Sequence, residues 1–145
     1  MKNSALTGDE KTDPFQFDNF DINHIAPIVD GVQYPAVPYT PDFEKDLYIR
    51  EYVGMYEALN QDEGIPQLEI DYKDYKSRLC FFCFDLSSNG YLGGESGVLS
   101  LMKRGYIRVD IKLKNASKEP FHMIALGQFD NLIQIDKFRN VVLDY

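Results

Sequence analysis

Basic residues, cysteine and histidine are scarce in this 145-residue chain, and long apolar runs are missing from it. The sequence holds 15 Lys and Arg against 23 Asp and Glu, with two histidines, two cysteines and no tryptophan. Nucleic acids and anionic membranes attract clustered positive charge, so direct binding to either is not expected. No segment approaches the roughly 18 to 20 apolar residues of a membrane span. The opening stretch MKNSALTGDEKTDP lacks the apolar core of a secretory signal, so secretion is not expected either.

The two cysteines, Cys80 and Cys83, lie in the apolar run LCFFCF. Such a run is typical of a strand, and residues three apart on a strand face opposite sides of the sheet. A second pair of ligands, which a zinc site would need, is also missing. We therefore expect two buried thiols, with neither a metal site nor a disulfide.

Each of the two histidines, His24 and His122, stands among apolar or aromatic neighbours. A catalytic histidine needs an orienting carboxylate together with a nucleophile or a water molecule. Asp21 and Asp30 are close to His24 in the sequence, but no serine or cysteine carries a nucleophile motif. We expect half-buried sheet histidines, no catalytic residues, no cofactor and a protein that is not an enzyme.

Two polar segments have some features of ligand-binding loops. The glycine-rich stretch SSNGYLGGESG lacks the Lys and Ser/Thr of a phosphate-binding loop. The carboxylates of Asp62, Glu63, Glu69 and Asp71 miss the alternating ligand spacing of an EF-hand. We interpret both segments as solvated surface loops and expect no bound metal.

Residues 40–61 have the pattern of an α-helix. Thr40 is placed to cap its N-terminus, and Pro41 suits the first helical position. Apolar residues recur at helical spacing on one face, with polar residues opposite. The apolar face carries Ile49, Tyr52, Val53, Tyr56 and Leu59, and the exposed face carries Arg50, Glu51 and Glu57. We expect this helix to cover the outside of a sheet.

The other apolar segments predict strands. Residues 22–37 favour two strands around Asp30-Gly31, a pair that accepts positive φ in a tight turn. Pro27 and Pro35 cannot donate ladder hydrogen bonds, which favours short or edge strands there. Residues 106–114 alternate strictly, with Ile107, Val109, Ile111 and Leu113 on one face.

Further strands are predicted at residues 77–86 and 121–129, and the closing residues predict a hairpin. The segments 131–136 and 140–145 are expected to pair across the turn Lys137–Asn140 and to complete a sheet. Their apolar side chains are expected to close the core, with Tyr145 near the domain edge. These side chains are Ile133, Ile135, Val141 and Leu143.

One helix among seven or eight strands predicts a mainly β fold. The architecture that we expect is a jelly-roll-like antiparallel β-sandwich with one α-helix packed outside. Residues 1–14 are polar and predict a disordered N-terminal lead-in. Residues 15–145 are then a single domain.

Five stretches, in this order, resemble segments of a known protein family. They are VDGVQYP, PDFEKDLYIREYVGMY, FDL, GYIRVDIKL and the closing FDNLIQIDKFRNVVLDY. Together they resemble the C-terminal part of the hexon-like, double jelly-roll capsid proteins of Polinton/Maverick-type elements, adintovirus-like viruses and their relics in animal genomes. The resemblance spans residues 13–145, and the closing block is its most specific part. Members of the family are several times longer, and the block NASKEPFHMIALGQ departs from their pattern.

The resemblance implies a structural capsid protein that acts by subunit assembly. Its partners are then other capsid subunits, with a homotrimer by analogy, and its location is the virion after synthesis inside the host cell. If a first jelly roll normally covers one side of this domain, the chain should expose an apolar patch. The alternative is a jelly-roll module that binds a peptide or carbohydrate through aromatic loops, such as Tyr91 and the segment QYPAVPY at residues 33–39.

Overall fold

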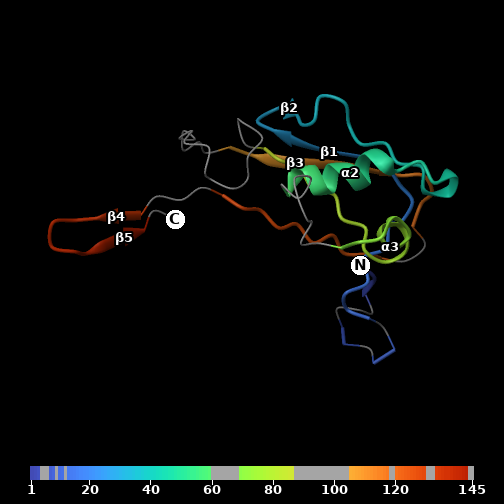
Figure 1. Ribbon diagram of the computed structural model, residues 1–145, viewed down its shortest axis with the longest axis horizontal. Helices are drawn as coiled ribbons and strands as arrows, with labels where there is room; N and C mark the ends of the chain where they lie inside the picture. Colours follow the sequence, from blue (N-terminus) through green and yellow to red (C-terminus); the bar gives the residue numbers. More distant parts are fainter. Residues whose placement is uncertain are drawn as a thin grey trace.

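A computed structural model describes residues 1–3, 7–8, 10–11, 13–59, 69–86, 105–117, 120–129 and 133–143 of the chain. Its elements in chain order are β1 (Ile22–Val29), β2 (Val32–Gln33), the 3₁₀ helix η1 (Phe43–Lys45), α2 (Ile49–Ala58), α3 (Tyr72–Ser77), β3 (Ile107–Leu113), β4 (Ile133–Ile135) and β5 (Val141–Leu143). Figure 1 shows a three-stranded sheet beside the helices and a two-stranded hairpin at the far end of the molecule.

The three-stranded sheet has the order β2–β1–β3, and both of its pairings are antiparallel. β1 pairs with β3 from Ile22 opposite Leu113 to Val29 opposite Ile107. The β-branched residues of both strands suit this pleated, half-buried arrangement. The sheet agrees with the predicted mainly β class. The jelly-roll sandwich, which needs a second packed sheet, stays a prediction.

The turn between β1 and β2 is the one that the sequence predicts. Asp30 and Gly31 have φ values of 49° and 86°, the left-handed values of a two-residue hairpin. The Oδ1 atom of Asp30 accepts a hydrogen bond from the backbone N–H of Tyr106 at 3.0 Å, which fixes the turn to the residue before β3. The predicted strand at residues 106–114 is confirmed as β3.

The expectation of short or edge strands holds for β2 and is wrong for β1. β1 runs through Pro27 and lies between the other two strands. The carbonyl of Pro27 accepts a hydrogen bond from the backbone N–H of Tyr34 at 2.9 Å, so the nitrogen of Pro27 also points to the β2 side. β2 ends at Gln33. The missing N–H therefore removes no bond from the ladder with β3.

The predicted helix at residues 40–61 is shorter and is preceded by a separate turn. Asp42 caps η1 by accepting a hydrogen bond from the backbone N–H of Lys45 at 3.3 Å. Asp46 then adopts a φ of 56°, which ends η1 before α2 begins. Thr40 and Pro41 lie outside both helices, so the expected capping by Thr40 is wrong.

The sequence predicts a single α-helix, but the structure has a second one, α3. Its residues, YKDYKS, are mostly polar and too few to show an apolar repeat. α3 is placed by tertiary contacts instead, because Tyr75 at its centre is completely buried.

The core between the helices is built largely from tyrosines. Tyr48, Met55 and Tyr75 are its largest fully buried side chains, and Phe43 and Ile70 complete the buried cluster. The ring of Tyr48 stacks on that of Tyr72 with centroids 4.2 Å apart. Burial raises the pKa of Tyr48 to about 12.

Each tyrosine hydroxyl of this core donates to a backbone carbonyl. Tyr75 donates to Phe81 at 2.8 Å, and Tyr52 and Tyr56 both donate to Ile70, at 2.7 and 3.0 Å. A buried hydroxyl is costly only when it lacks a partner, so tyrosine can serve here as a core residue.

The buried face of α2 differs from the predicted one. Ile49, Val53 and Leu59 are exposed, whereas Glu51 is only 4% exposed. The carboxylate of Glu51 accepts a hydrogen bond from the backbone N–H of Thr40 at 3.1 Å. That bond compensates for the burial of a charged group and turns α2 so that Glu51, Gly54, Met55 and Ala58 face inward. Tyr52 and Tyr56, predicted as inward, are half-buried.

The predicted central strand at residues 77–86 is wrong. Ser77 ends α3, and Leu79 forms a single bridge with Phe17. Residues 80–86 form no ladder with the described strands, and residues 79–83 pack against the tyrosine core. The apolar run therefore reflects burial between helices rather than burial within a sheet.

The closing hairpin is confirmed, but its predicted place in the core is wrong. β4 pairs with β5 in the register Ile133–Leu143, Gln134–Val142 and Ile135–Val141. The pair forms a two-stranded sheet of its own, and Ile133, Ile135 and Val141 are exposed to 60%, 69% and 60%. Among the described residues, no element covers this face. Tyr145 lies outside the described residues.

The predicted strand at residues 121–129 is also wrong, because within the described range only Phe121 forms a bridge, with Lys2. The N-terminal amine of Met1 donates to the carbonyl of His122 at 3.2 Å, which places the first residues against this segment.

The division at residue 14 into a lead-in and a domain stays a prediction. In the described part of the chain, no helix has the length and apolar character of a membrane span.

Candidate functional site

A pocket of about 400 Å³ opens where the segment after β2, the helix α2 and residues 83–85 meet. Aromatic and small residues dominate its walls, and two carboxylates join them. The lining residues are Tyr34, Pro35, Tyr39, Gly54, Glu57, Ala58, Cys83, Phe84 and Asp85. Three of them belong to the segment QYPAVPY, which the sequence indicates as a binding loop. Tyr91, the other aromatic residue of that prediction, lies outside the described residues.

The segment QYPAVPY is fixed from both sides by hydrogen bonds to its backbone. Tyr39 exchanges two bonds with Ile25 of β1, at 3.0 and 3.1 Å. From α2, the guanidinium of Arg50 donates to the carbonyls of Val37 and Pro38 at 2.8 and 2.9 Å. These bonds hold the segment in one conformation.

Gly54 explains how α2 and the segment QYPAVPY approach each other so closely. A Cβ atom at position 54 would overlap the hydroxyl group of Tyr39. A glycine inside a helix costs stability and is kept where the backbone must come close to another group. The sequence shows this glycine within the predicted helix, and the close approach of Tyr39 is the reason for it.

Two aromatic rings of the lining lie against each other. Those of Tyr39 and Phe84 are stacked, with centroids 5.2 Å apart and an angle of 26° between the planes. The guanidinium carbon of Arg50 lies 5.0 Å from the centroid of the Tyr39 ring, within the range of a cation–π contact. Burial raises the pKa of the Tyr39 phenol, Arg50 opposes that change, and the carboxylate of Glu57 adds to it.

Cys83 lines the pocket, and Cys80 lies in the core behind it. Both are free, partly buried thiols. Burial raises the pKa of Cys80 to about 12 and also raises that of Cys83, so both are protonated at neutral pH. The sequence predicts the two thiols on opposite faces of a strand. That strand is wrong, since residues 80–86 belong to none of the described strands. In the described part of the chain, no cluster of His, Cys, Asp and Glu could hold a metal ion.

The two histidines are far from equivalent. His24 is half-buried on β1, as the sequence predicts. His122 is exposed and lies outside the described strands, so the expectation of a second sheet histidine is wrong. Its Nε2 atom lies 2.8 Å from the Oδ1 atom of Asn3. Neither lines the pocket.

The predicted acidic loop lies partly outside the described residues. Asp62 and Glu63 lie outside the described residues, as does the glycine-rich stretch at 87–97. Glu69 is exposed, and Asp71 precedes α3, where its carbonyl accepts a hydrogen bond from the N–H of Tyr75 at 2.8 Å.

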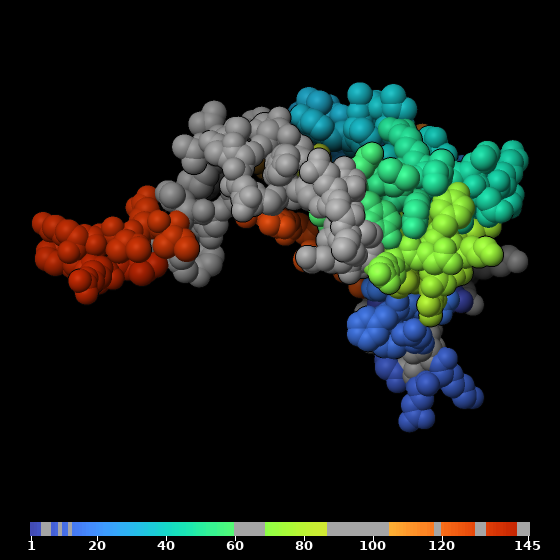
Figure 2. All heavy atoms as spheres, viewed as in Figure 1, coloured from blue at the N-terminus to red at the C-terminus, as the bar shows by residue number. Residues whose placement is uncertain are grey.

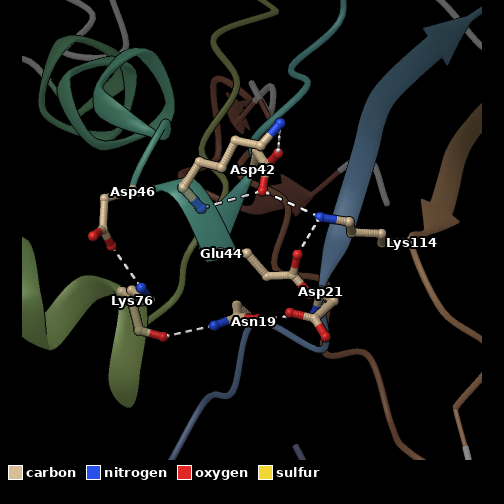
Figure 3. A network of polar contacts seen from close by, with 8 residues as sticks. Asn19, Asp21, Asp42, Glu44, Asp46, Lys76 and Lys114 are labelled. Atoms are coloured by element: carbon tan, nitrogen blue, oxygen red, sulfur yellow. Dashed lines mark hydrogen bonds and ion pairs between the residues drawn. The ribbon is translucent and has the colours of Figure 1, made fainter.

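A surface network of ion pairs joins η1 and its two capping residues to α3 and to Lys114, the residue after β3 (Figure 3). Lys114 lies 2.5 Å from Glu44 and 3.4 Å from Asp42, and Lys76 lies 2.5 Å from Asp46. Exposed pairs of this kind contribute about 0 to 1 kcal/mol each. Because their charges are mutually paired, we interpret the network as structural.

An apolar surface lies on residues 120–129 and 133–143, which we call the apolar arm. Figure 2 shows β4 and β5 at one end of the molecule, away from α2 and α3. Apolar side chains along the arm are strongly exposed, and Leu126 is 99% exposed. The others above half exposure are Met123, Ile124, Phe129, Ile133, Ile135, Phe138 and Val141.

No family model and no solved structure match the chain. Among curated proteins, it is similar to an uncharacterized protein of Caenorhabditis elegans, F54H12.2, with 22% identity over 147 residues. The match covers 99% of this chain and 34% of that protein. The chain therefore spans about a third of the length of the curated relative that it matches. The name of that relative gives no activity.

Proposed function

We propose that the chain is a structural protein that assembles with copies of itself, as a capsid subunit of the hexon-like class. The resemblance of residues 13–145 supports this proposal, together with the antiparallel β structure. The proposal includes a jelly-roll architecture, a trimeric capsomer, a location in the virion and no enzymatic activity.

The observation that carries the proposal is the exposed face of the β4–β5 hairpin. A two-stranded hairpin alone is marginally stable in water, and its outer edges leave backbone groups unpaired. Ile133, Ile135 and Val141 on this hairpin are nevertheless exposed. Contiguous apolar surface of this kind marks a protein interface. We infer that a neighbouring subunit covers the face.

The arm is also large enough for such an interface. A standard protein–protein interface uses roughly 20 to 30 residues from each partner. The described residues of the arm, 120–129 and 133–143, lie at about the lower end of that range even without Phe121 and His122, which contact the N-terminal residues. A second copy of the chain is the partner that the resemblance implies, because capsid shells are built from repeated subunits.

Sedimentation velocity over a hundredfold range of protein concentration tests the proposal. The expected result is a shift from monomer to a discrete oligomer as the concentration rises. Ile135→Lys should move that shift to higher concentration by about tenfold or more, because it places a charge on the apolar face. Gln134→Lys, which adds the same charge at the neighbouring exposed position, is the control and should have little effect. A strict monomer at all concentrations would contradict the proposal.

A second function is favoured by the pocket. A cavity of about 400 Å³, with three aromatic residues in its lining, lies within the size range of ligand sites. It supports the alternative of a binding module for a peptide or a carbohydrate. The two functions are compatible, since the pocket and the apolar arm use different residues. Titration with short peptides and oligosaccharides, followed by the NMR signals of Gly54 and Ala58, tests this function.

A further inference from the structure

We propose that the aromatic pocket binds an organic cation, the guanidinium group of an arginine side chain in a basic peptide segment. The inference rests on the second proposed function, a binding module, and names its ligand class. It is independent of subunit assembly through the apolar arm.

Charge is the first argument. Glu57 and Asp85 place two carboxylates in the lining, and the described lining contains no Lys, Arg or His. Glu57 is exposed on α2, so its charge is available to a ligand without a prior conformational change. A carboxylate accepts hydrogen bonds and donates none, which suits the five N–H donors of a guanidinium.

The aromatic walls are the second argument. The face of a phenol or phenyl ring attracts a cation placed within about 6 Å of its centroid. The chain already uses this attraction, because its own Arg50 lies 5.0 Å from the centroid of Tyr39. Tyr34 and Phe84 line the same pocket and offer further ring surface. Tyr34 is 41% exposed, so its ring is accessible to an incoming side chain.

Ligand chemistry separates this proposal from a carbohydrate site. A sugar ring stacks on aromatic residues, but its hydroxyl groups need both donors and acceptors. Among the lining side chains, the carboxylates of Glu57 and Asp85 accept hydrogen bonds, and the hydroxyls of Tyr34 and Tyr39 can donate them. The two acidic groups add negative charge, which attracts a cation and has no counterpart on a neutral sugar. The combination of ring faces with carboxylates therefore favours a planar, donor-rich cation over a neutral polyol.

The test uses the full chain labelled with ¹⁵N and two synthetic pentapeptides, acetyl-Gly-Gly-X-Gly-Gly-amide. In one peptide X is arginine, and in the other it is citrulline, which has nearly the same shape and no charge. The amide signals of Gly54, Ala58 and Asp85 report on the pocket. We expect the arginine peptide to bind about tenfold or more tightly than the citrulline peptide, with an affinity that falls as salt is added.

Glu57→Gln is the informative variant, because it removes one charge at an exposed position and leaves the fold intact. It should weaken binding of the arginine peptide severalfold and leave binding of the citrulline peptide unchanged. Glu69→Gln makes the same chemical change at an exposed glutamate outside the pocket and should bind like the unmodified chain. Tyr34→Leu should also weaken binding, through loss of a ring face.

The outcomes distinguish the inference from the function on which it rests. If citrulline and arginine peptides bind equally, or if an oligosaccharide binds and neither peptide does, the pocket is a binding site but the cation proposal is wrong. If no ligand shifts the pocket signals, both are wrong. If Glu57→Gln leaves the affinity for the arginine peptide unchanged, the Glu57 carboxylate does not recognise the guanidinium charge, and the proposal is overturned.

Discussion

Replacing Tyr75 by phenylalanine should measure how much one hydroxyl contributes to the tyrosine core. The Tyr75 ring is fully buried against Tyr48 and Tyr52, and its hydroxyl donates to the carbonyl of Phe81 at 2.8 Å. Phenylalanine keeps the ring contacts and leaves that carbonyl without its donor. The expected loss in the free energy of unfolding is about 1 to 3 kcal/mol.

Urea unfolding followed by circular dichroism is the assay. With an m-value of about 1 to 3 kcal/mol/M, a loss of about 1.5 kcal/mol lowers the midpoint by roughly 0.5 to 1.5 M. Tyr72→Phe is the control, because the Tyr72 hydroxyl donates to the carbonyl of Asp46 at an exposed position. It should cost under about 0.5 kcal/mol. If Tyr75→Phe and Tyr72→Phe lower the free energy of unfolding equally, the Tyr75 hydroxyl bond is no more buried than the exposed one. If Tyr75→Ala lowers it by well under about 3 kcal/mol, the Tyr75 ring is not buried.

Three further predictions concern other parts of the fold. Glu51→Ala should lower the free energy of unfolding by about 0.5 to 1.5 kcal/mol in the same assay, because the part-buried hydrogen bond from the backbone N–H of Thr40 is lost. Gly54→Ala should be destabilising despite the better helix propensity of alanine, since the new methyl overlaps the Tyr39 hydroxyl, and a more stable variant would refute the close approach. The hydrogen bond from the Asn140 side chain, with those from backbone N–H groups of the turn, lowers the pKa of Asp136. The ionised Asp136 therefore stabilises the hairpin fully above its unfolded pKa, about 4, and this stabilisation is lost as the pH falls through the lower pKa of the folded state. A pH titration of the Asn140 amide chemical shift should follow this loss.

The parts of the fold that depend on residues close together in the sequence could be predicted from it. The β1–β2 turn follows from Asp30-Gly31, and β3 from strict alternation. The hairpin follows from two apolar segments around the turn Lys137–Asn140, where Asp136 accepts hydrogen bonds from the N–H groups of Phe138 and Asn140 at 2.7 and 2.9 Å. These signals are local and need no tertiary contact.

The errors have tertiary causes. The apolar run at residues 77–86 has the composition of a central strand, but the described chain buries much of it against tyrosines of α2 and α3. The inward position of Glu51 depends on a partner 11 residues away, which helical periodicity does not contain. In both cases, contacts between segments overrode the local pattern.

The candidate pocket was predictable in part. Its loop, with Tyr34 and Tyr39, follows from the concentration of aromatic residues and prolines in QYPAVPY. Phe84 was assigned to a strand, and Glu57 to a solvated helix face, so neither was connected with the loop. Only folding brings Phe84 and Glu57 together with Gly54. A glycine inside a helix was the one sequence signal that another group, here the Tyr39 hydroxyl, comes close to the helix backbone.

Hydrogen–deuterium exchange at two protein concentrations tests most directly whether a second copy covers the apolar arm. Exchange is compared at a dilution where the chain is monomeric and at a concentration at least a hundredfold higher. The account predicts that the amides of β4 and β5 become protected at the high concentration, while those of β1 and β3 exchange equally in both. If the hairpin amides exchange at the same rate at every concentration, no copy covers them, and the assembly proposal is contradicted.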